Sequence, residues 1–204
     1  KMNQTLAQAK QLATDLKNIS YSATQVDVAV CPPYTALATV ADALKGSSIA
    51  WGAQDVSPQK PGAYTGDIAG EFLVDLACKY TIVGHSERRQ YHRENDFIIN
   101  AKVHRLLELA IQPIFCIGET LEQRELEITM DVVHTQLRAG LVKITAEQAR
   151  FITIAYEPVW AIGTGKVATP QQAEEVHAFI RKSLSERFGA DAANAMRLQY
   201  GGSV

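Results

Sequence analysis

Six short apolar runs recur along the chain, and all but the last are followed by a segment with the apolar spacing of an amphipathic helix. The runs span residues 26–31, 49–53, 80–84, 113–117, 151–156 and 196–200. Runs that are apolar on both faces, such as TIVG and PIFCIG, are typical of parallel strands covered by helices. The alternation of strand and helix therefore predicts an α/β fold.

Two α/β architectures fit this alternation, an open doubly wound sheet and a closed (β/α)8 barrel. Polar residues distinguish them, because a barrel places functional groups after many strands whereas an open sheet concentrates them at one switch point. Polar residues at or just past the ends of different runs are Gln54, His85, Glu119, Glu157 and Ser203. This distribution favours the barrel.

The length of the chain suggests an incomplete barrel. A complete barrel takes about 250 residues, whereas this sequence has 204. It offers a leading helix at 4–17 and six strands, so one strand before Lys1 and one strand and helix after Val204 would complete the count. We therefore expect a single (β/α)8-barrel domain over residues 1–204 that lacks its first strand and its last strand and helix.

The clearest helix follows the fifth run. Thr169 can cap it, Pro170 suits its first turn, Gln172 completes a capping box and Gly189 can end it. The sequence therefore predicts a helix between Thr169 and Gly189.

Composition excludes several classes of function. The net charge is −2 with no long run of one sign, which argues against nucleic acid or an anionic membrane surface as a partner. No apolar stretch approaches the roughly 20 residues of a membrane span.

The three cysteines lack a CxxC pattern, so they predict neither a disulfide framework nor structural zinc, and a reducing cytoplasm fits best. The other histidines lack metal-ligand spacing and are expected to be ordinary helix or surface residues: His92, His104, His134 and His177.

His85 ends the apolar run in YTIVGHSERR. A lone histidine at a strand end is more often a structural hydrogen-bonding group than a catalyst. Here Glu87 and two arginines follow at once, and a helix that begins near Ser86 would place its positive end beside the ring. That field favours a neutral imidazole, which can polarise a carbonyl group.

Glu157 follows a buried strand in AYEPVWAIGTGK. A surface acid at the start of a loop is the ordinary interpretation. The next residues are too apolar for an idle loop, and the glycines at 163 and 165 supply backbone freedom at its far end. This composition predicts a lid that excludes water above Glu157. The final GTGK is not a nucleotide-binding loop, because Val167 stands where Ser or Thr is needed.

Two further loops carry hypotheses. Gly201 and Gly202 before Ser203 permit backbone amides to approach an anion, and barrels often bind phosphate after their seventh strand. The alternative is a plain tight turn. The long connection at 55–66 is either an arm that docks on another subunit or a simple exposed loop.

Taken together, these motifs resemble the triosephosphate isomerase family. The matching pieces are KMN at 1–3, WGAQD at 51–55, GAYTG at 62–66, GHSERR at 84–89, CIGET at 116–120, AYEPVWAIGTGK at 155–166 and YGGSV at 200–204. They span the whole chain in the family's order. The resemblance implies interconversion of dihydroxyacetone phosphate and D-glyceraldehyde 3-phosphate through an enediol(ate), with no cofactor and no metal.

The resemblance also implies residue roles. Glu157 is similar to the family's base, His85 to its neutral electrophile, and Lys1 to the lysine that stabilises negative charge. Glu87 matches a carboxylate near that lysine and His85. Gly163, Ser203 and Lys1 match substrate-binding positions. The lid would comprise Pro158, Val159, Trp160, Ala161, Ile162, Gly163, Thr164, Gly165 and Lys166. Thr65 and Gly66 match the loop that reaches into a neighbouring subunit, which implies a homodimer.

Two other functions are compatible with an α/β barrel. A Schiff-base aldolase on the same architecture needs a lysine at a strand end, where this chain has Glu157. A barrel that only binds sugar phosphates would leave the combination of base, electrophile and ammonium unexplained. The aldolase is disfavoured, and the non-catalytic binding barrel stays the alternative function.

Overall fold

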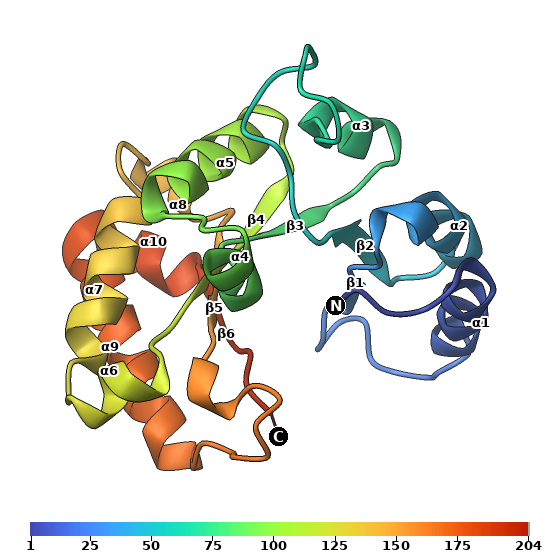
Figure 1. Ribbon diagram of the computed structural model, residues 1–204. Coiled ribbons are helices and arrows are strands. Elements are labelled where there is room, and N and C mark those ends of the chain that lie inside the picture. The colour runs from blue at the N-terminus through green and yellow to red at the C-terminus, as the bar shows by residue number, and fades with distance from the viewer. Residues whose placement is uncertain (204) are drawn as a thin grey trace. The chain divides into compact units, whose positions relative to one another are not determined.

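Six strands alternate with helices along the chain in a computed structural model that describes residues 1–203 (Figure 1). The fold divides into two compact units. The first contains Lys1–Ile82 and Glu108–Gln112, and the second contains Val83–Leu107 and the described residues from Pro113 onward. The single domain over residues 1–204 stays a prediction.

Three strands pair in parallel in the first unit. The strands are β1 (Ala29–Val30), β2 (Ala50–Ala53) and β3 (Tyr80–Val83), and the helices are α1 (Leu6–Lys17), α2 (Tyr34–Leu44) and α3 (Gly70–Asp75). Val30 pairs with Trp51, and Gly52 pairs with Tyr80. Small side chains bring α1 against α2 in a core of Ala9, Ala13, Ala36, Val40, Leu44 and Ile49.

The helix α1 begins two residues later than the sequence predicted. Gln4 has a φ of 78°, which is not helical, and Thr5 is the N-cap. The Thr5 side chain accepts a hydrogen bond from Gln8 N, and the Gln8 side chain accepts from Thr5 N in return. This capping box satisfies amides at the helix start that have no partner within the helix.

The remaining strands are β4 (Gln112–Ile117), β5 (Thr153–Tyr156) and β6 (Arg197–Tyr200). Beside them lie α4 (Ser86–Tyr91), α5 (Asp96–Glu108), α6 (Leu121–Glu125), α7 (Thr129–Gly140), α8 (Ala146–Ala149), the 3₁₀ turn η1 (Val159–Ala161), α9 (Pro170–Phe188) and α10 (Ala190–Ala195). Ile117 pairs with Tyr156, and Tyr156 pairs with Tyr200, both in parallel.

The six predicted strands are confirmed, although β1 is shorter than the apolar run at 26–31. The predicted helix between Thr169 and Gly189 is also confirmed, with Thr169 as N-cap, its capping box with Gln172, and Gly189 at a φ of 85° directly after its end. Within residues 1–203, no helix is long and apolar enough to cross a membrane.

The parallel pairing in the second unit determines where functional groups gather. The carboxyl ends of β4, β5 and β6 lie at one edge, so the residues that follow them are neighbours. Glu157 comes directly after β5, Glu119 two residues after β4 and Ser203 three residues after β6. The candidate site is built on this edge.

Candidate active site

Glu157 is a buried carboxylate at the end of β5. All four residues of β5 are buried, and Glu157 itself is only 5% exposed. Its backbone N–H donates to Ile117 O at 2.7 Å, which extends the β4–β5 ladder by one hydrogen bond. The backbone of the carboxylate is therefore fixed by the sheet.

His85 faces that carboxylate from the residue before α4. Its Nδ1 accepts a hydrogen bond from Glu87 N at 3.2 Å. Because an accepting nitrogen carries no proton, the neutral ring must carry its proton on Nε2. Nε2 lies 3.2 Å from Glu157 Oε1. The structure thus brings together the two residues that the sequence predicted as base and electrophile.

The second oxygen of Glu157 is also occupied. Ser86 N donates to Glu157 Oε2 at 3.0 Å. The carboxylate thus spans His85 and the first residue of α4. The predicted helix start near Ser86 is confirmed, and its amide has a use that the sequence did not reveal.

Glu87 lies on the other side of the His85 ring. One of its carboxylate oxygens is 3.8 Å from His85 Nδ1, and its side chain is 42% exposed. This distance is too long for a hydrogen bond. The close partner of Nδ1 is the backbone amide of Glu87.

The predicted lid begins with η1 and is held by Glu119. Trp160 Nε1 donates to Glu119 Oε1 at 2.8 Å, and Tyr156 OH donates to both oxygens of the same carboxylate at 3.1 Å. Arg124 completes the set, with an ion pair to Glu119 of 3.2 Å and its guanidinium 4.8 Å from the Trp160 ring centre. Glu119 has no exposed surface. Sequence reasoning noted its place after a strand but missed this role.

The far end of the lid has the backbone conformation that its glycines permit. Gly163 has a φ of 67° and Gly165 a φ of 76°. Thr164 Oγ1 donates to Trp160 O at 2.7 Å and accepts from Lys166 N at 3.3 Å. The loop is therefore internally hydrogen-bonded between its apolar start and its glycine-rich end.

Ser203 lies against the lid. Its backbone N–H donates to Ala161 O at 3.1 Å, and Gly201 N donates to Tyr156 O at 2.8 Å. The amide that the sequence assigned to phosphate is thus bonded to a lid carbonyl group.

A cavity of about 570 Å³ lies beside these groups. Its lining includes Glu157, Ser86, Gly118, Gln136, Val159 and Trp160. This volume is within the range of roughly 300–1,000 Å³ that is usual for small-molecule sites. The cavity therefore has room for a small molecule beside the carboxylate.

Two titratable groups behind the site stay neutral. Burial and the neighbouring Glu119 raise the pKa of Tyr156, so its hydroxyl remains a donor. Burial lowers the pKa of His177, whose ring lies edge-on to Tyr156 at 6.0 Å. His177 is on α9, as the sequence predicted.

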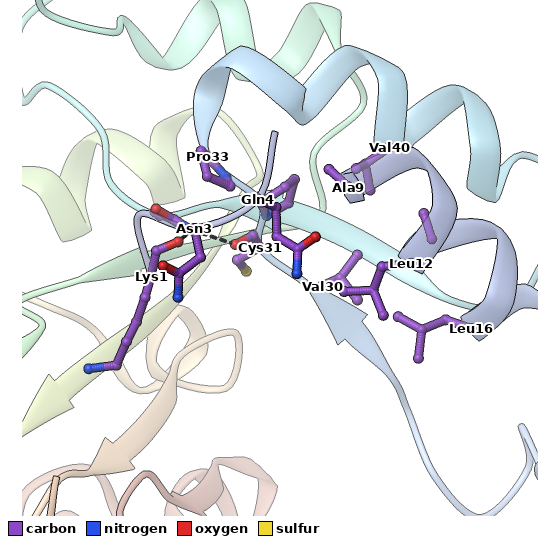
Figure 2. Close-up of a pocket in the computed structure, with 13 residues that line it drawn as sticks. Lys1, Asn3, Gln4, Ala9, Leu12, Leu16, Val30, Cys31, Pro33 and Val40 are labelled. Carbon is purple, nitrogen blue, oxygen red and sulfur yellow. Dashed lines mark hydrogen bonds between the residues drawn. The ribbon is translucent and has the colours of Figure 1, made fainter. Parts of the chain in front are cut away.

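Lys1 belongs to the first unit, and its place beside Glu157 stays a prediction. It lines a cavity of about 200 Å³ with Cys31 and Gln54, and its side chain extends away from Leu12 and Leu16 (Figure 2). Gln54 Nε2 donates to Lys1 O at 3.0 Å and to Cys31 O at 2.9 Å. These bonds fix the backbone of Lys1.

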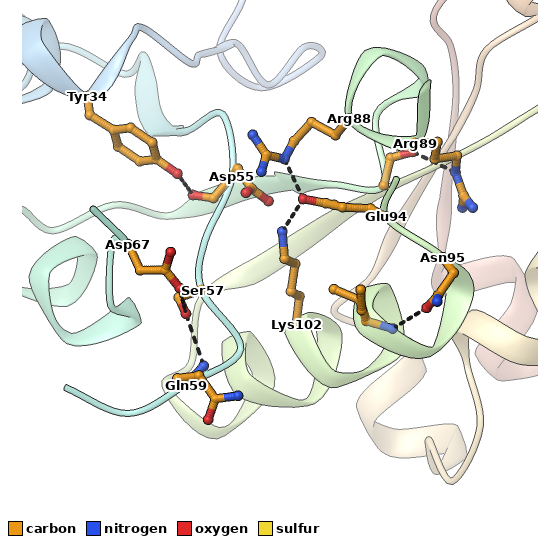
Figure 3. A network of polar contacts seen from close by, with 12 residues as sticks. Tyr34, Asp55, Ser57, Gln59, Asp67, Arg88, Arg89, Glu94, Asn95 and Lys102 are labelled. Carbon is orange, nitrogen blue, oxygen red and sulfur yellow. Dashed lines mark hydrogen bonds and ion pairs between the residues drawn. The ribbon is translucent and has the colours of Figure 1, made fainter. Parts of the chain in front are cut away.

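The loop that carries Thr65 and Gly66 is exposed in the first unit. Ser57 Oγ donates to Asp67 Oδ2 at 2.6 Å across its base (Figure 3). Ser57 N also donates to Ile68 O at 2.8 Å. The exposed tip at Thr65 and Gly66 therefore belongs to a loop whose base is closed by these two hydrogen bonds.

Among the described residues, no group of three or more His, Cys, Asp and Glu side chains is placed to hold a metal ion.

Comparison with known proteins gives a consistent result. A family model described as triosephosphate isomerase matches residues 1–204. A triosephosphate isomerase of Carboxydothermus hydrogenoformans is 53% identical over 195 residues, covering 96% of this chain and 76% of the relative. Those of Moorella thermoacetica and Chloroherpeton thalassium are 50% and 49% identical, each covering 100% of this chain and 81% of the relative.

Proposed function

Since this chain belongs to the triosephosphate isomerase family, we propose that Glu157 and His85 carry out the proton transfers of its reaction. That reaction is the interconversion of dihydroxyacetone phosphate and D-glyceraldehyde 3-phosphate, a step of glycolysis and gluconeogenesis. The six-stranded parallel α/β fold corresponds to part of the family's barrel. This chain spans 76% to 81% of the length of the relatives described above.

Glu157 acts as the base. Its carboxylate removes a proton from the carbon next to the substrate carbonyl, and the electron pair of that C–H bond moves to give an enediolate. The protonated carboxyl then returns the proton to the neighbouring carbon, which forms the isomer without gain or loss of atoms. The burial of Glu157 supports this role, because a carboxylate that bulk water does not solvate is available to the substrate carbon.

His85 acts as the electrophile. Its Nε2–H donates to the substrate oxygen that becomes negative, and moves a proton between the two enediolate oxygens. The observation that carries this proposal is the 3.2 Å distance between His85 Nε2 and Glu157 Oε1, with Nδ1 held by the Glu87 amide. A donor on a rigid backbone needs no reorganisation when charge develops.

The other groups bind the substrate. Lys1 stabilises the developing negative charge with its ammonium group, and Glu87 holds His85 through its backbone amide. The amides of Gly163 and Ser203 bind the phosphate, which requires Ser203 N to exchange Ala161 O for a phosphate oxygen. Closure of the lid at 158–166 then excludes water from the reacting carbons.

The protein is proposed to form a homodimer through the loop at Thr65 and Gly66, whose tip is exposed and whose base is hydrogen-bonded. A cytoplasmic location is supported by Cys31, Cys78 and Cys116, none of which forms a disulfide. Burial raises the pKa of Cys31 to about 12 and that of Cys78 to about 11, so both stay protonated and slow to react.

Replacement of the base tests the proposal. In the full-length protein, we expect Glu157→Gln to lower kcat by about a thousandfold, because an amide cannot accept the proton. Isomerisation in deuterium oxide is the second measurement, since an enediolate route places solvent deuterium on the carbon that Glu157 reprotonates. A near-normal kcat for Glu157→Gln, in a variant with unchanged melting temperature, would refute the role.

A further inference from the structure

Gln136 holds the peptide groups of Gly118 at two points. Its Oε1 accepts from Gly118 N at 2.8 Å, and its Nε2 donates to Gly118 O at 3.2 Å. The orientation of the amide is unambiguous, because a backbone N–H only donates and a backbone carbonyl only accepts. The Gln136 side chain on α7 thus makes the two backbone hydrogen bonds with Gly118 that a neighbouring β-strand would otherwise make.

Gly118 in turn lies directly against the base. A Cβ atom on Gly118 would come 1.8 Å from Glu157 O and 3.3 Å from Glu157 Cα, so the two backbones are in contact with no room for a side chain. The carbonyl groups on either side of Gly118 bond to the segment that contains Glu157. Ile117 O accepts from Glu157 N at 2.7 Å, and Glu119 O accepts from Val159 N at 3.1 Å.

The segment 117–119 therefore supports both the base and the root of the lid, and Gln136 fixes its centre. Gly118 is buried, so its N–H and C=O need partners within the protein. Gln136 also lines the cavity beside Glu157 and Trp160. Its neighbours on α7, Val133 and Leu137, are buried in the core and already attach the helix.

We propose that Gln136 is a positioning residue for the isomerisation, which acts through Gly118 on the backbone of Glu157. The inference rests on the proposed role of Glu157 as base. A base that is displaced by a fraction of an ångström loses rate because the reacting atoms no longer meet in line. Loss of either bond to Gly118 therefore lowers kcat, whereas KM changes little because both polar atoms of the Gln136 amide bond to Gly118.

Two variants of Gln136 remove different hydrogen bonds to Gly118. Gln136→Met keeps the length of the side chain and removes both hydrogen bonds. Gln136→Glu keeps the acceptor for Gly118 N but, when ionised, has no proton for Gly118 O. We expect each to lower kcat by about tenfold with KM within about twofold of the wild-type value. Gln171→Met, at an exposed position in the first turn of α9, is the matched control and is expected to leave kcat unchanged.

The pH profile of Gln136→Glu distinguishes positioning from a general loss of stability. Protonation restores a donor to the introduced carboxyl, so the ratio of its kcat to the wild-type kcat should rise as pH falls towards the ordinary glutamate pKa of about 4.3. A kcat within twofold of wild type in both variants would overturn the inference. So would a ratio that does not change with pH, or a loss confined to KM.

Glu157→Gln is assayed in parallel. If that variant is inactive while both Gln136 variants are normal, only the inference on Gln136 fails. If Glu157→Gln is active, the proposed function itself fails.

Discussion

Oε1 of Glu157 lies 3.2 Å from Nε2 of His85, while Oε2 of the same carboxylate accepts from Ser86 N at 3.0 Å. The proposed base and electrophile are thus each other's partners in this structure. A substrate carbonyl that takes the proton of Nε2 must replace Glu157 Oε1 as acceptor. Substrate binding therefore releases the carboxylate from His85 at the moment when it is needed at the carbon atom.

The first prediction concerns the donor. We expect His85→Ala to lower kcat by about a hundredfold or more, as removal of one oxyanion donor does in other enzymes. Steady-state kinetics on the full-length protein measures the effect. His92→Ala is the control, because His92 is exposed at the end of the same short helix. A loss of less than threefold in His85→Ala would contradict the role as electrophile.

The second prediction concerns the buried carboxylate that holds the lid. Glu119→Gln keeps the shape of the side chain but removes the charge that Trp160 Nε1, Tyr156 OH and Arg124 share. Hydrogen bonds to charged groups contribute roughly 1.5–3 kcal/mol, so we expect amide exchange in the segment 158–166 to become at least about tenfold faster. Hydrogen exchange read by mass spectrometry resolves this segment.

A second segment of the same variant serves as the control. Backbone amide hydrogens of α5 should exchange at the wild-type rate, because no residue of α5 is among these partners of Glu119. Equal exchange at 158–166 in the two proteins would show that Glu119 does not hold the lid.

The fold was predictable where its causes are local in the sequence. The bounds of α9 follow from Thr169, Gln172 and Gly189, each of which acts on atoms within a few residues of itself. The first strand is shorter than its apolar run because only Ala29 and Val30 are paired with β2. Pairing depends on a neighbouring strand, and the apolar pattern alone does not report it.

The candidate site was predictable where its residues carry a local sequence signal. Glu157 and His85 stand directly after apolar runs, and the sequence placed both at strand ends. The roles of Glu119 and Gln136 depend on partners 18 to 41 residues away, which packing brings together. For Glu119, an acid after a buried strand was a usable signal. For Gln136, one amide on a helix carries no local signal, because its partner is the backbone of Gly118.

The structure also contains a buried ionic cluster in the second unit. Glu94 Oε1 accepts from Arg88 Nε at 2.6 Å and from Lys102 Nζ at 2.7 Å (Figure 3). Glu94 is 7% exposed and Lys102 is 3% exposed. Burial by itself raises the pKa of Glu94, but the hydrogen bonds and charges of Lys102 and Arg88 outweigh it, and the net effect lowers the pKa below its usual value of 4.5.

The third prediction follows from the sign of that shift. A carboxyl whose pKa is lower in the folded state stabilises the protein above its unfolded pKa, and the contribution is lost as pH falls through the folded pKa. We expect Glu94→Gln to lower the free energy of unfolding by about 3 kcal/mol at pH 7, because the buried Lys102 and the partly buried Arg88 lose the charge of Glu94. Below the usual glutamate pKa of 4.5 the difference from wild type should shrink. Urea denaturation between pH 3 and pH 7 measures this difference in the free energy of unfolding.

Glu175→Gln, at an exposed position on α9, is the control and should follow the wild-type curve throughout. A difference that stays constant with pH would mean that the charge of Glu94 does not stabilise the fold.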